Sequence, residues 1–503
     1  MRRDSGDRTY FVTDERLREF SKLTPAQRLE WVEQCSKFIR LARLNWPDKP
    51  TVKTDPNSSL YGDDPTRAGI DVSGPSSQIL LEALHRKALR TGIGERTRSL
   101  LRGFRWTMPA AMYSRVVCGL TTVLAARTLG PADFGLANLA LATTLWVQVP
   151  LFMGIPAAIT HFVPQARSEE KPAWILGGFR LLFACGTITL LIGYGLSPLW
   201  SRLQGVATAE FNMGLLWCLG FFLFICATTA FNALENFRAR AIAEVVFASL
   251  FPLVILWTVL DRRLTAGLYV GGLAIAYGIT GLYGLVWNFR TLRPRPASST
   301  GTMSSQLLRY GALASLGAIA SALFLAPARV IANQYLSLSD VGILSAYQSG
   351  SIQMASFLLG ISSQVFFPIA SRTGDKEQLF RKITRLMLTT SPLVLSSLIG
   401  SLALYFLILG KGYPWRAADS IVFCIAAALS LFQGILGWYL AAFGRRGLVA
   451  CSLIGLVSGA VNVAGCFLLI PDWKILGAGI ANIASAGSAI FLSCLPQIRK
   501  YSR

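Results

Sequence analysis

Three arginines fall within long apolar stretches of the sequence, where an uncompensated charge is costly. Arg115 lies about ten residues into the first stretch and Arg180 about six residues into the third, and Arg329 lies in the seventh with some seven residues left before the following loop. An arginine at the centre of a bilayer costs about 2.5–3.5 kcal/mol on insertion scales, so such a residue is a functional candidate by default. A guanidinium offers a planar fork of donors that suits phosphate oxygens. We predict that the three side chains line a cavity and bind an anion.

Each arginine also has a purely structural interpretation. Arg115 alternatively pairs with an acid or a backbone carbonyl of a neighbouring helix. Arg329 and Arg180 lie closer to the ends of their stretches, and both are long enough to snorkel to the nearer membrane surface.

Acidic residues that could serve enzymes or metal ions are scarce in the apolar stretches. Glu235 and Glu244 flank one short loop, and we expect them to pair with Arg238 and Arg240. The longest loop, residues 290–306, contains no carboxylate, and no metal-ligand spacing or phosphate-cradling glycine loop occurs. The sequence therefore predicts neither an enzyme nor a bound metal or cofactor.

The arginines must be positioned by membrane-spanning helices. The 503 residues are 53% hydrophobic and 15% charged, with a mean hydropathy of +0.48, whereas soluble domains carry about 25% charged residues. Apolar runs of helical length, suited to a hydrocarbon core of about 30 Å, predict an all-α polytopic protein of about 12 transmembrane helices in two six-helix lobes. The predicted spans are 106–128, 136–163, 174–197, 211–233, 241–260, 266–289, 307–333, 341–369, 384–409, 418–442, 448–470 and 475–496.

Basic residues predict the orientation of these helices, because Lys and Arg are enriched in cytoplasmic loops. Twenty precede the first span and 18 lie in the even-numbered loops and C-terminus, against seven in the odd-numbered loops. Both termini are therefore predicted to be cytoplasmic, with the pair Arg262–Arg263 as the one discordant feature. The net charge of +22 reflects this bias and attraction to an anionic inner leaflet, so no nucleic-acid partner is predicted.

The first hundred residues differ from the rest and predict a cytoplasmic extension. A helix is expected after Thr24, followed by a linker rich in Pro, Gly, Ser and Asp over 46–77 and a basic juxtamembrane helix. The extension is either a simple tail or a partner-binding segment. The predicted divisions are the extension (1–103), a first lobe (104–290), a basic cytoplasmic linker (291–306), a second lobe (307–497) and a cytoplasmic tail (498–503).

The two predicted lobes share a short repeat. Residues 123–136, VLAARTLGPADFGL, align with residues 330–343, VIANQYLSLSDVGI, at an offset of 207, so that Asp133 matches Asp340 and Gly135 matches Gly342. Each copy lies between the first and second helix of a six-helix set. Since six is even, both sets enter from the same side, which predicts parallel repeats related by an axis along the membrane normal.

The first copy of the repeat also carries a family resemblance. The stretch LAARTLGPADFGLANLAL resembles the first-loop signature of prokaryotic polysaccharide flippases, a family of the multidrug/oligosaccharidyl-lipid/polysaccharide exporter superfamily. The resemblance runs over about residues 106–497 and includes ILGAGIANIASA near the end. The residues of the loop signature and its repeat are Arg127, Gly130, Pro131, Asp133, Phe134, Gly135, Asp340 and Gly342. Arg127 and Asp133 are expected to pair or to organise this loop.

The resemblance implies a transporter of undecaprenyl-pyrophosphate-linked oligosaccharide across the cytoplasmic membrane, for O-antigen, capsule or exopolysaccharide biosynthesis. Arg115, Arg329 and Arg180 would then hold the pyrophosphate, and polysaccharide polymerase or export machinery would be a partner beside the lipid bilayer. Pro156 and Pro327 are expected to provide gating bends, although simple packing irregularity is an alternative. The other functional interpretation is a multidrug or cation antiporter of the same superfamily, which the embedded arginines disfavour.

Overall fold

The computed structural model describes residues 95–292, 300–372, 376–443 and 445–501. The helix and linker expected within residues 1–94 lie outside these ranges. The chain divides between Arg90 and Thr91 into two units, and everything described below belongs to the second. The described residues form α-helices and one short 3₁₀ helix, Val163–Gln165.

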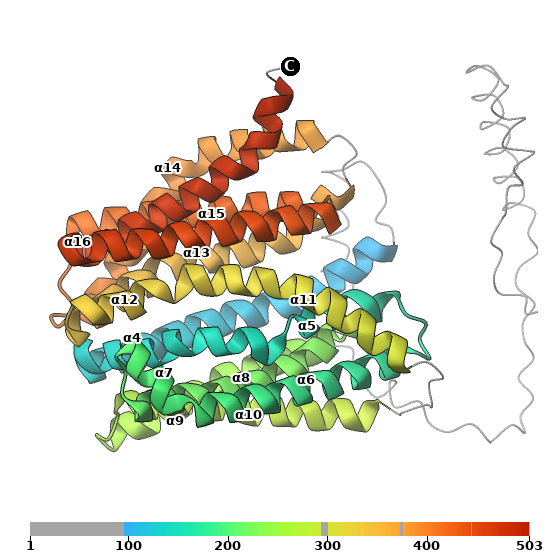
Figure 1. Cartoon of the computed structure of the whole chain (residues 1–503), viewed down its shortest axis with the longest axis horizontal. Helices are drawn as coiled ribbons and strands as arrows, with labels where there is room; N and C mark the ends of the chain where they lie inside the picture. Colours follow the sequence, from blue (N-terminus) through green and yellow to red (C-terminus); the bar gives the residue numbers. More distant parts are fainter. Residues whose placement is uncertain (1–94, 293–299, 373–375, 444, 502–503) are drawn as a thin grey trace, which may run out of the picture. The chain divides into compact units, whose positions relative to one another are not determined.

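Twelve membrane crossings account for the long helices of the described residues, as the hydropathy pattern predicts, and Figure 1 shows these helices arranged side by side. The two longest helices contain two crossings each, and α11 and α12 together form one crossing. Nine of the described helical segments are long and apolar enough to cross a membrane. The crossings are α4 (Glu95–Phe152, twice), α6 (Lys171–Gly195), α8 (Thr208–Ala233), α9 (Phe237–Leu260), α10 (Ala266–Thr291), α11 (Thr300–Leu325) with α12 (Pro327–Tyr335), α13 (Leu338–Arg372), α14 (Lys376–Leu409), α15 (Ala417–Ala441) and α16 (Arg445–Tyr501, twice).

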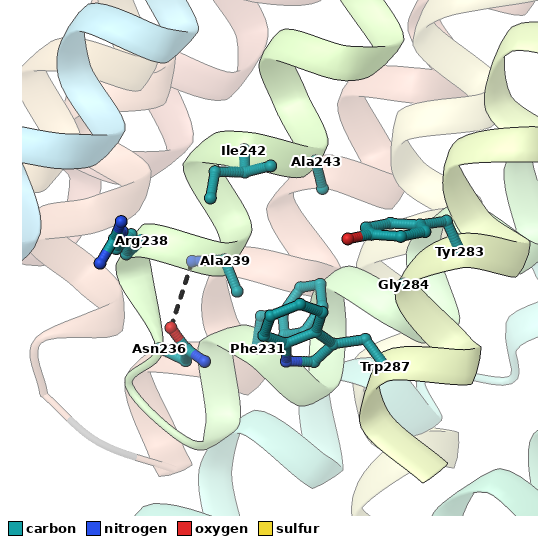
Figure 2. A pocket seen from close by; sticks show the side chains of 9 residues that line it. All are labelled: Phe231, Asn236, Arg238, Ala239, Ile242, Ala243, Tyr283, Gly284 and Trp287. Atoms are coloured by element: carbon teal, nitrogen blue, oxygen red, sulfur yellow. Dashed lines mark hydrogen bonds between the residues drawn. The ribbon is translucent and has the colours of Figure 1, made fainter. Parts of the chain in front are cut away.

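Local backbone chemistry places the reversals between crossings. The chain reverses within α4 at Gly130, whose φ of 77° is open to glycine at no steric cost, and Pro131 begins the next crossing. In α16 the reversal is at Lys474 (φ 51°). Asn236 caps α9 by accepting a hydrogen bond from the Ala239 amide at 3.1 Å (Figure 2).

Some boundaries differ from those expected from the sequence. Helix α11 begins at Thr300, so helix occupies part of the segment predicted as a linker over 291–306. The second crossing, predicted over 136–163, is interrupted at Met153 and Gly154, which have φ of 43° and 63°, and it resumes as α5 (Ile155–Phe162). A further short helix, α7 (Ser197–Gln204), lies in the predicted loop after the third span.

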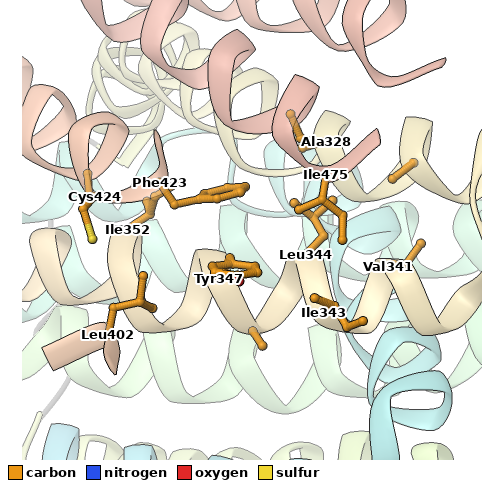
Figure 3. Close-up of a cluster of buried hydrophobic side chains, with 14 of the residues drawn as sticks. Ala328, Val341, Ile343, Leu344, Tyr347, Ile352, Leu402, Phe423, Cys424 and Ile475 are labelled. Carbon is orange, nitrogen blue, oxygen red and sulfur yellow. The ribbon is translucent and has the colours of Figure 1, made fainter. Parts of the chain in front are cut away.

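The helices group into the two predicted halves, with α4 and α11 between the two groups in Figure 1. Helices α13 to α16 form one group, and α6, α8, α9 and α10 form the other. The largest buried cluster belongs mainly to the group α13 to α16 (Figure 3), where the Tyr347 ring stacks on Phe423 at 5.4 Å and also contacts Phe406. Aromatic packing of this kind helps to hold α13, α14 and α15 together.

Candidate functional site

A cavity of about 270 Å³ lies between the two halves, and Arg329 lines it. The first half contributes the second crossing of α4 and Trp217 of α8, and the second half contributes the α11–α12 crossing and α13. The polar side chains of the wall are Asn138, Arg329, Gln348, Gln353 and Ser356. The structure thus places one of the three predicted arginines at the seam between the halves.

A break in the seventh crossing positions Arg329. Pro327 has no N–H to donate to the Leu323 carbonyl, so the helix ladder is interrupted there. The amide nitrogen of Asn462, on α16, donates instead to the carbonyls of Leu323 and Phe324, at 3.2 and 3.0 Å. Helix α12 therefore starts in a fixed direction, and Arg329 follows two residues later.

Several polar atoms at the cavity are buried and lack a hydrogen-bond partner among the described residues. They are the Arg329 Nε, the Trp217 Nε1 and the Gln348 Oε1. An unpaired buried group costs about 1–3 kcal/mol, so these donors and this acceptor favour a polar occupant. The phenol groups of Tyr269 and Tyr405 lie within electrostatic range of Arg329, and no carboxylate is among the residues that line the cavity.

Arg115 and Arg180 do not line this cavity. Both side chains are exposed, on α4 and α6, and neither forms an ion pair among the described residues. Arg115 is 15 residues from the turn at Gly130, and Arg329 is eight residues from Ser337. At a helix rise of 1.5 Å per residue, Arg115 therefore lies roughly 10 Å farther than Arg329 from the end of the bundle that contains Gly130 and Ser337.

The acid beside Ser114, Glu244, is already satisfied by groups other than Arg115. Ser114 donates to the Glu244 Oε1 at 3.1 Å, and the Arg240 guanidinium bonds Oε2 at 3.0 Å. The predicted pairing of Glu244 with Arg240 is therefore confirmed, and an ion pair of Arg115 with Glu244 is not formed. No pair between Glu235 and Arg238 occurs in the described part of the chain.

The two copies of the loop signature meet at one end of the seam. A Cβ on Gly135 would lie 2.8 Å from the Gly342 amide nitrogen, and a Cβ on Gly342 would lie 2.7 Å from the Pro131 carbonyl carbon. Real Cβ atoms do not approach so closely, so both positions require glycine. Phe134, fully buried beside them, contacts the rings of Tyr269 and Tyr413.

Other residues of the signature act locally. Ser337 caps the start of α13, because its hydroxyl accepts a hydrogen bond from the Asp340 amide at 3.2 Å, and the same hydroxyl donates to the Asp340 carboxylate at 2.7 Å. Arg127 and Asp133 are both exposed and form no ion pair with each other in the described residues.

Further contacts close this end of the seam, which we call the signature end. The Tyr413 hydroxyl donates to the Ala126 carbonyl at 3.0 Å, and the Asn333 amide donates to the Gly205 carbonyl at 2.9 Å. The opposite end, where α4 and α11 begin, is called the basic end. Nearer the basic end, Gly154 packs on Gly311, and the His161 ring stacks on Tyr310 at 4.6 Å. The cavity is therefore bounded by contacts between the halves on both sides.

Comparison with known proteins connects this architecture to a family. A family model described as "Polysaccharide biosynthesis protein" matches residues 100–374, more than half of the chain. The chain belongs to this family. No curated protein matches the sequence.

Solved structures show the fold that this family member shares. The chain is similar to a lipid II flippase MurJ in an inward closed conformation, with a TM-score of 0.56 and 11% identity over 77% of this chain and 86% of that one. It is also similar to an inward-facing MATE multidrug resistance transporter of the MOP superfamily, with a TM-score of 0.55 and 13% identity over 77% of this chain and 95% of that one. A third similar structure is a MOP superfamily transporter from Pyrococcus furiosus, with a TM-score of 0.56 and 12% identity over 80% of this chain and 96% of that one. The protein is thus a multi-pass membrane protein with a MOP-superfamily transporter fold, as the loop signature predicts.

Reasoning from the sequence missed most of the residues that surround Arg329. Trp217 and Gln348 carry no motif, and their approach to Arg329 depends on how the halves pack. Asn462 did leave a signal, because an amide inside an apolar span needs a partner. The matched glycines were found as a repeat, but their mutual contact required the structure.

Proposed function

We propose that this protein moves an undecaprenyl-pyrophosphate-linked oligosaccharide across the cytoplasmic membrane for biosynthesis of a surface polysaccharide such as O-antigen, capsule or exopolysaccharide. Transport proceeds by alternating access, in which the two halves rock around the cavity at Arg329. The polar head group enters the cavity, and the polyprenyl chain stays in the lipid beside the halves.

The single observation that carries this proposal is the Arg329 guanidinium in a cavity between the halves, where its Nε is buried and has no hydrogen-bond partner among the described residues. A half-buried cation with no acid among the residues that line its cavity attracts an anion, and its fork of donors matches pyrophosphate oxygens. A cationic drug would be repelled by Arg329, and no carboxylate of the cavity wall would attract it. These charges support an anionic cargo over a cation antiporter.

The size of the cavity supports alternating access. Sites for drug-sized ligands have volumes of about 300–1,000 Å³. The cavity of about 270 Å³ is large enough for a pyrophosphate group, whereas an attached oligosaccharide needs more room. In the proposed cycle the halves therefore separate at one end to admit it.

We assign supporting parts to the remaining predicted residues. Arg115 and Arg180, both exposed and without an ion pair in the described ranges, would provide further positive charge for the pyrophosphate as the halves open. Pro327 at the α11–α12 break, and Pro156 two residues after the left-handed Gly154, would act as the bends of that movement.

The basic end faces the cytoplasm in this proposal, because most of the loop arginines and lysines lie there. Both termini would then be cytoplasmic, and the signature end would face the outside. Polysaccharide polymerase or export machinery would take over the cargo on that side.

Replacing Arg329 tests the proposal. In a strain that lacks this protein, Arg329→Ala is expected to abolish export of surface polysaccharide while protein level and membrane insertion stay normal. A charge-assisted hydrogen bond is worth about 1.5–3 kcal/mol, so binding of the pyrophosphate should weaken roughly 10- to 150-fold. Arg329→Lys should keep part of the activity, because it retains the charge and loses the fork.

The matched control is Arg202→Ala, which removes an exposed arginine on α7 at the signature end and should leave export unchanged. Wild-type export by Arg329→Ala would refute the cavity's role. Extrusion of a cationic dye by proteoliposomes of the wild-type protein, unaffected by Arg329→Ala, would favour the antiporter instead.

A further inference from the structure

A second pocket, of about 260 Å³, opens on the outer surface of the first half near the basic end (Figure 2). It shares no residue with the cavity at Arg329. Helix α9 forms one wall with Ala239, Ile242 and Ala243. Helix α10 forms the other with Tyr283, Gly284 and Trp287, and Phe231 of α8 lies behind Trp287.

This pocket faces the region occupied by lipid. The side chains at its mouth are substantially exposed although they are apolar, with values of 56% for Tyr283, 46% for Trp287 and 46% for Ile242. Leu282 and Val286, which neighbour the two aromatic residues on α10, are also exposed. An exposed apolar surface on a membrane-spanning helix contacts hydrocarbon, so an acyl chain can enter between α9 and α10.

The rim toward the basic end is polar and positively charged. Asn236 uses its carbonyl oxygen to cap α9 and keeps its amide hydrogens for another acceptor. The Arg238 guanidinium lies 5.6 Å from the centre of the Trp106 ring and forms no ion pair among the described residues. Stacking on Trp106 restrains the plane of the guanidinium and leaves the N–H groups at its edge free to bind an anion.

Gly284 makes the depth of the pocket possible. A Cβ at this position would come within 2.8 Å of the Ala227 Cβ and 3.4 Å of the Phe231 ring. Helix α10 therefore packs closely on α8, and the rings of Tyr283 and Trp287 project from α10 toward α9 (Figure 2). Tryptophan and tyrosine are enriched at the level of lipid head groups. Tyr283 and Trp287 therefore place the pocket close to the membrane surface, where a lipid could bind with its head group at Arg238.

We propose that this pocket binds an anionic phospholipid of the leaflet at the basic end. The phosphate lies at Arg238 and Asn236, and one acyl chain lies between Ile242 and the rings of Tyr283 and Trp287. The site is distinct from the transport cavity, and it does not depend on which cargo the protein carries. A phospholipid held there anchors the loop between α8 and α9 to the membrane surface.

Native mass spectrometry of the purified full-length protein tests this site, with phosphatidylglycerol and phosphatidylcholine of the same chain length as probes. The wild-type protein should retain phosphatidylglycerol more strongly. An arginine near an anionic surface is worth about 1 kcal/mol, so Arg238→Gln should weaken phosphatidylglycerol binding about fivefold and leave phosphatidylcholine binding unchanged. Glu235→Gln, which removes an exposed acid from the same loop, should strengthen phosphatidylglycerol binding.

The matched control is Arg167→Gln, which removes an exposed arginine at the same end of the bundle but away from the pocket. Ala239→Phe should reduce binding of both lipids, because the new ring fills the pocket. Arg238→Lys, which keeps the charge, shows whether a loss in Arg238→Gln reflects misfolding. Equal binding of both lipids by the wild-type protein, or displacement of phosphatidylglycerol by equimolar undecaprenyl phosphate, would overturn the assignment.

Discussion

Two buried asparagines on α16 offer a matched test of how the break before Arg329 is held. Both Asn462 and Asn482 are fully buried. The Asn462 amide bonds the carbonyls of Leu323 and Phe324, whereas both polar atoms of the Asn482 side chain lack partners among the described residues. Leucine has nearly the shape of asparagine, so the same substitution at each position isolates the hydrogen bonds.

Asn462→Leu should destabilise the protein, and Asn482→Leu should not. A buried carbonyl left without a partner costs about 1–3 kcal/mol. Asn462→Leu leaves the Leu323 carbonyl without a hydrogen-bond donor, because Pro327 has no N–H, and it removes the side-chain donor to the Phe324 carbonyl. We therefore expect the free energy of unfolding to fall by about 2–3 kcal/mol. Asn482→Leu removes two unsatisfied groups, so its effect should lie between zero and a gain of about 1 kcal/mol.

The assay is thermal unfolding of the purified protein in one detergent, together with hydrogen exchange of the amides of α12. Asn462→Leu should lower the midpoint and speed exchange in α12, which carries Arg329, while Asn482→Leu leaves both unchanged or raises the midpoint. Equal midpoints for Asn462→Leu and the wild type, with a lower one for Asn482→Leu, would refute this account of the break.

Two further predictions concern the movement of the halves. Gly342→Ala should abolish transport by pushing the halves apart, because its Cβ would lie 2.7 Å from the Pro131 carbonyl carbon, whereas Gly400→Ala, with open space around it, should be tolerated in the same export assay. Pro327→Ala restores a helix N–H and should make Asn462→Leu less damaging than it is alone, so additive effects on the unfolding midpoint would contradict this competition for the Leu323 carbonyl.

The sequence predicts the crossings and the repeat well, because bilayer thickness fixes helix length and a charged loop must leave the membrane. It also locates the reversal at Gly130, where a glycine precedes a proline. Arg115 shows the limit of such reasoning, since the position of a charge along a helix does not define the direction of its side chain or its neighbours. Ser114 contacts Glu244 in its place, and this depends on how α4 packs against α9.

The surroundings of Arg329 depend on four separate stretches of chain and could not be predicted from spacing alone. Trp217 and Gln348 look like ordinary residues of apolar helices. They are significant because the Trp217 Nε1 and the Gln348 Oε1 are buried beside Arg329 and have no hydrogen-bond partner among the described residues. Burial is a property of the assembled halves and cannot be seen in the sequence.

The contact between Gly135 and Gly342 has a geometric consequence for transport. These residues occupy equivalent positions of the repeat, 207 residues apart, and two equivalent points can touch only at the axis that relates them. The contact therefore marks a fulcrum at the signature end. With a lever of about 30 Å, the thickness of the hydrocarbon core, a tilt of about 15° would part the basic ends by about 8 Å. In the proposed cycle only a small adjustment is needed at the fulcrum while the basic end opens, so Gly135 and Gly342 would stay in contact during that step and separate when the signature end opens to release the cargo.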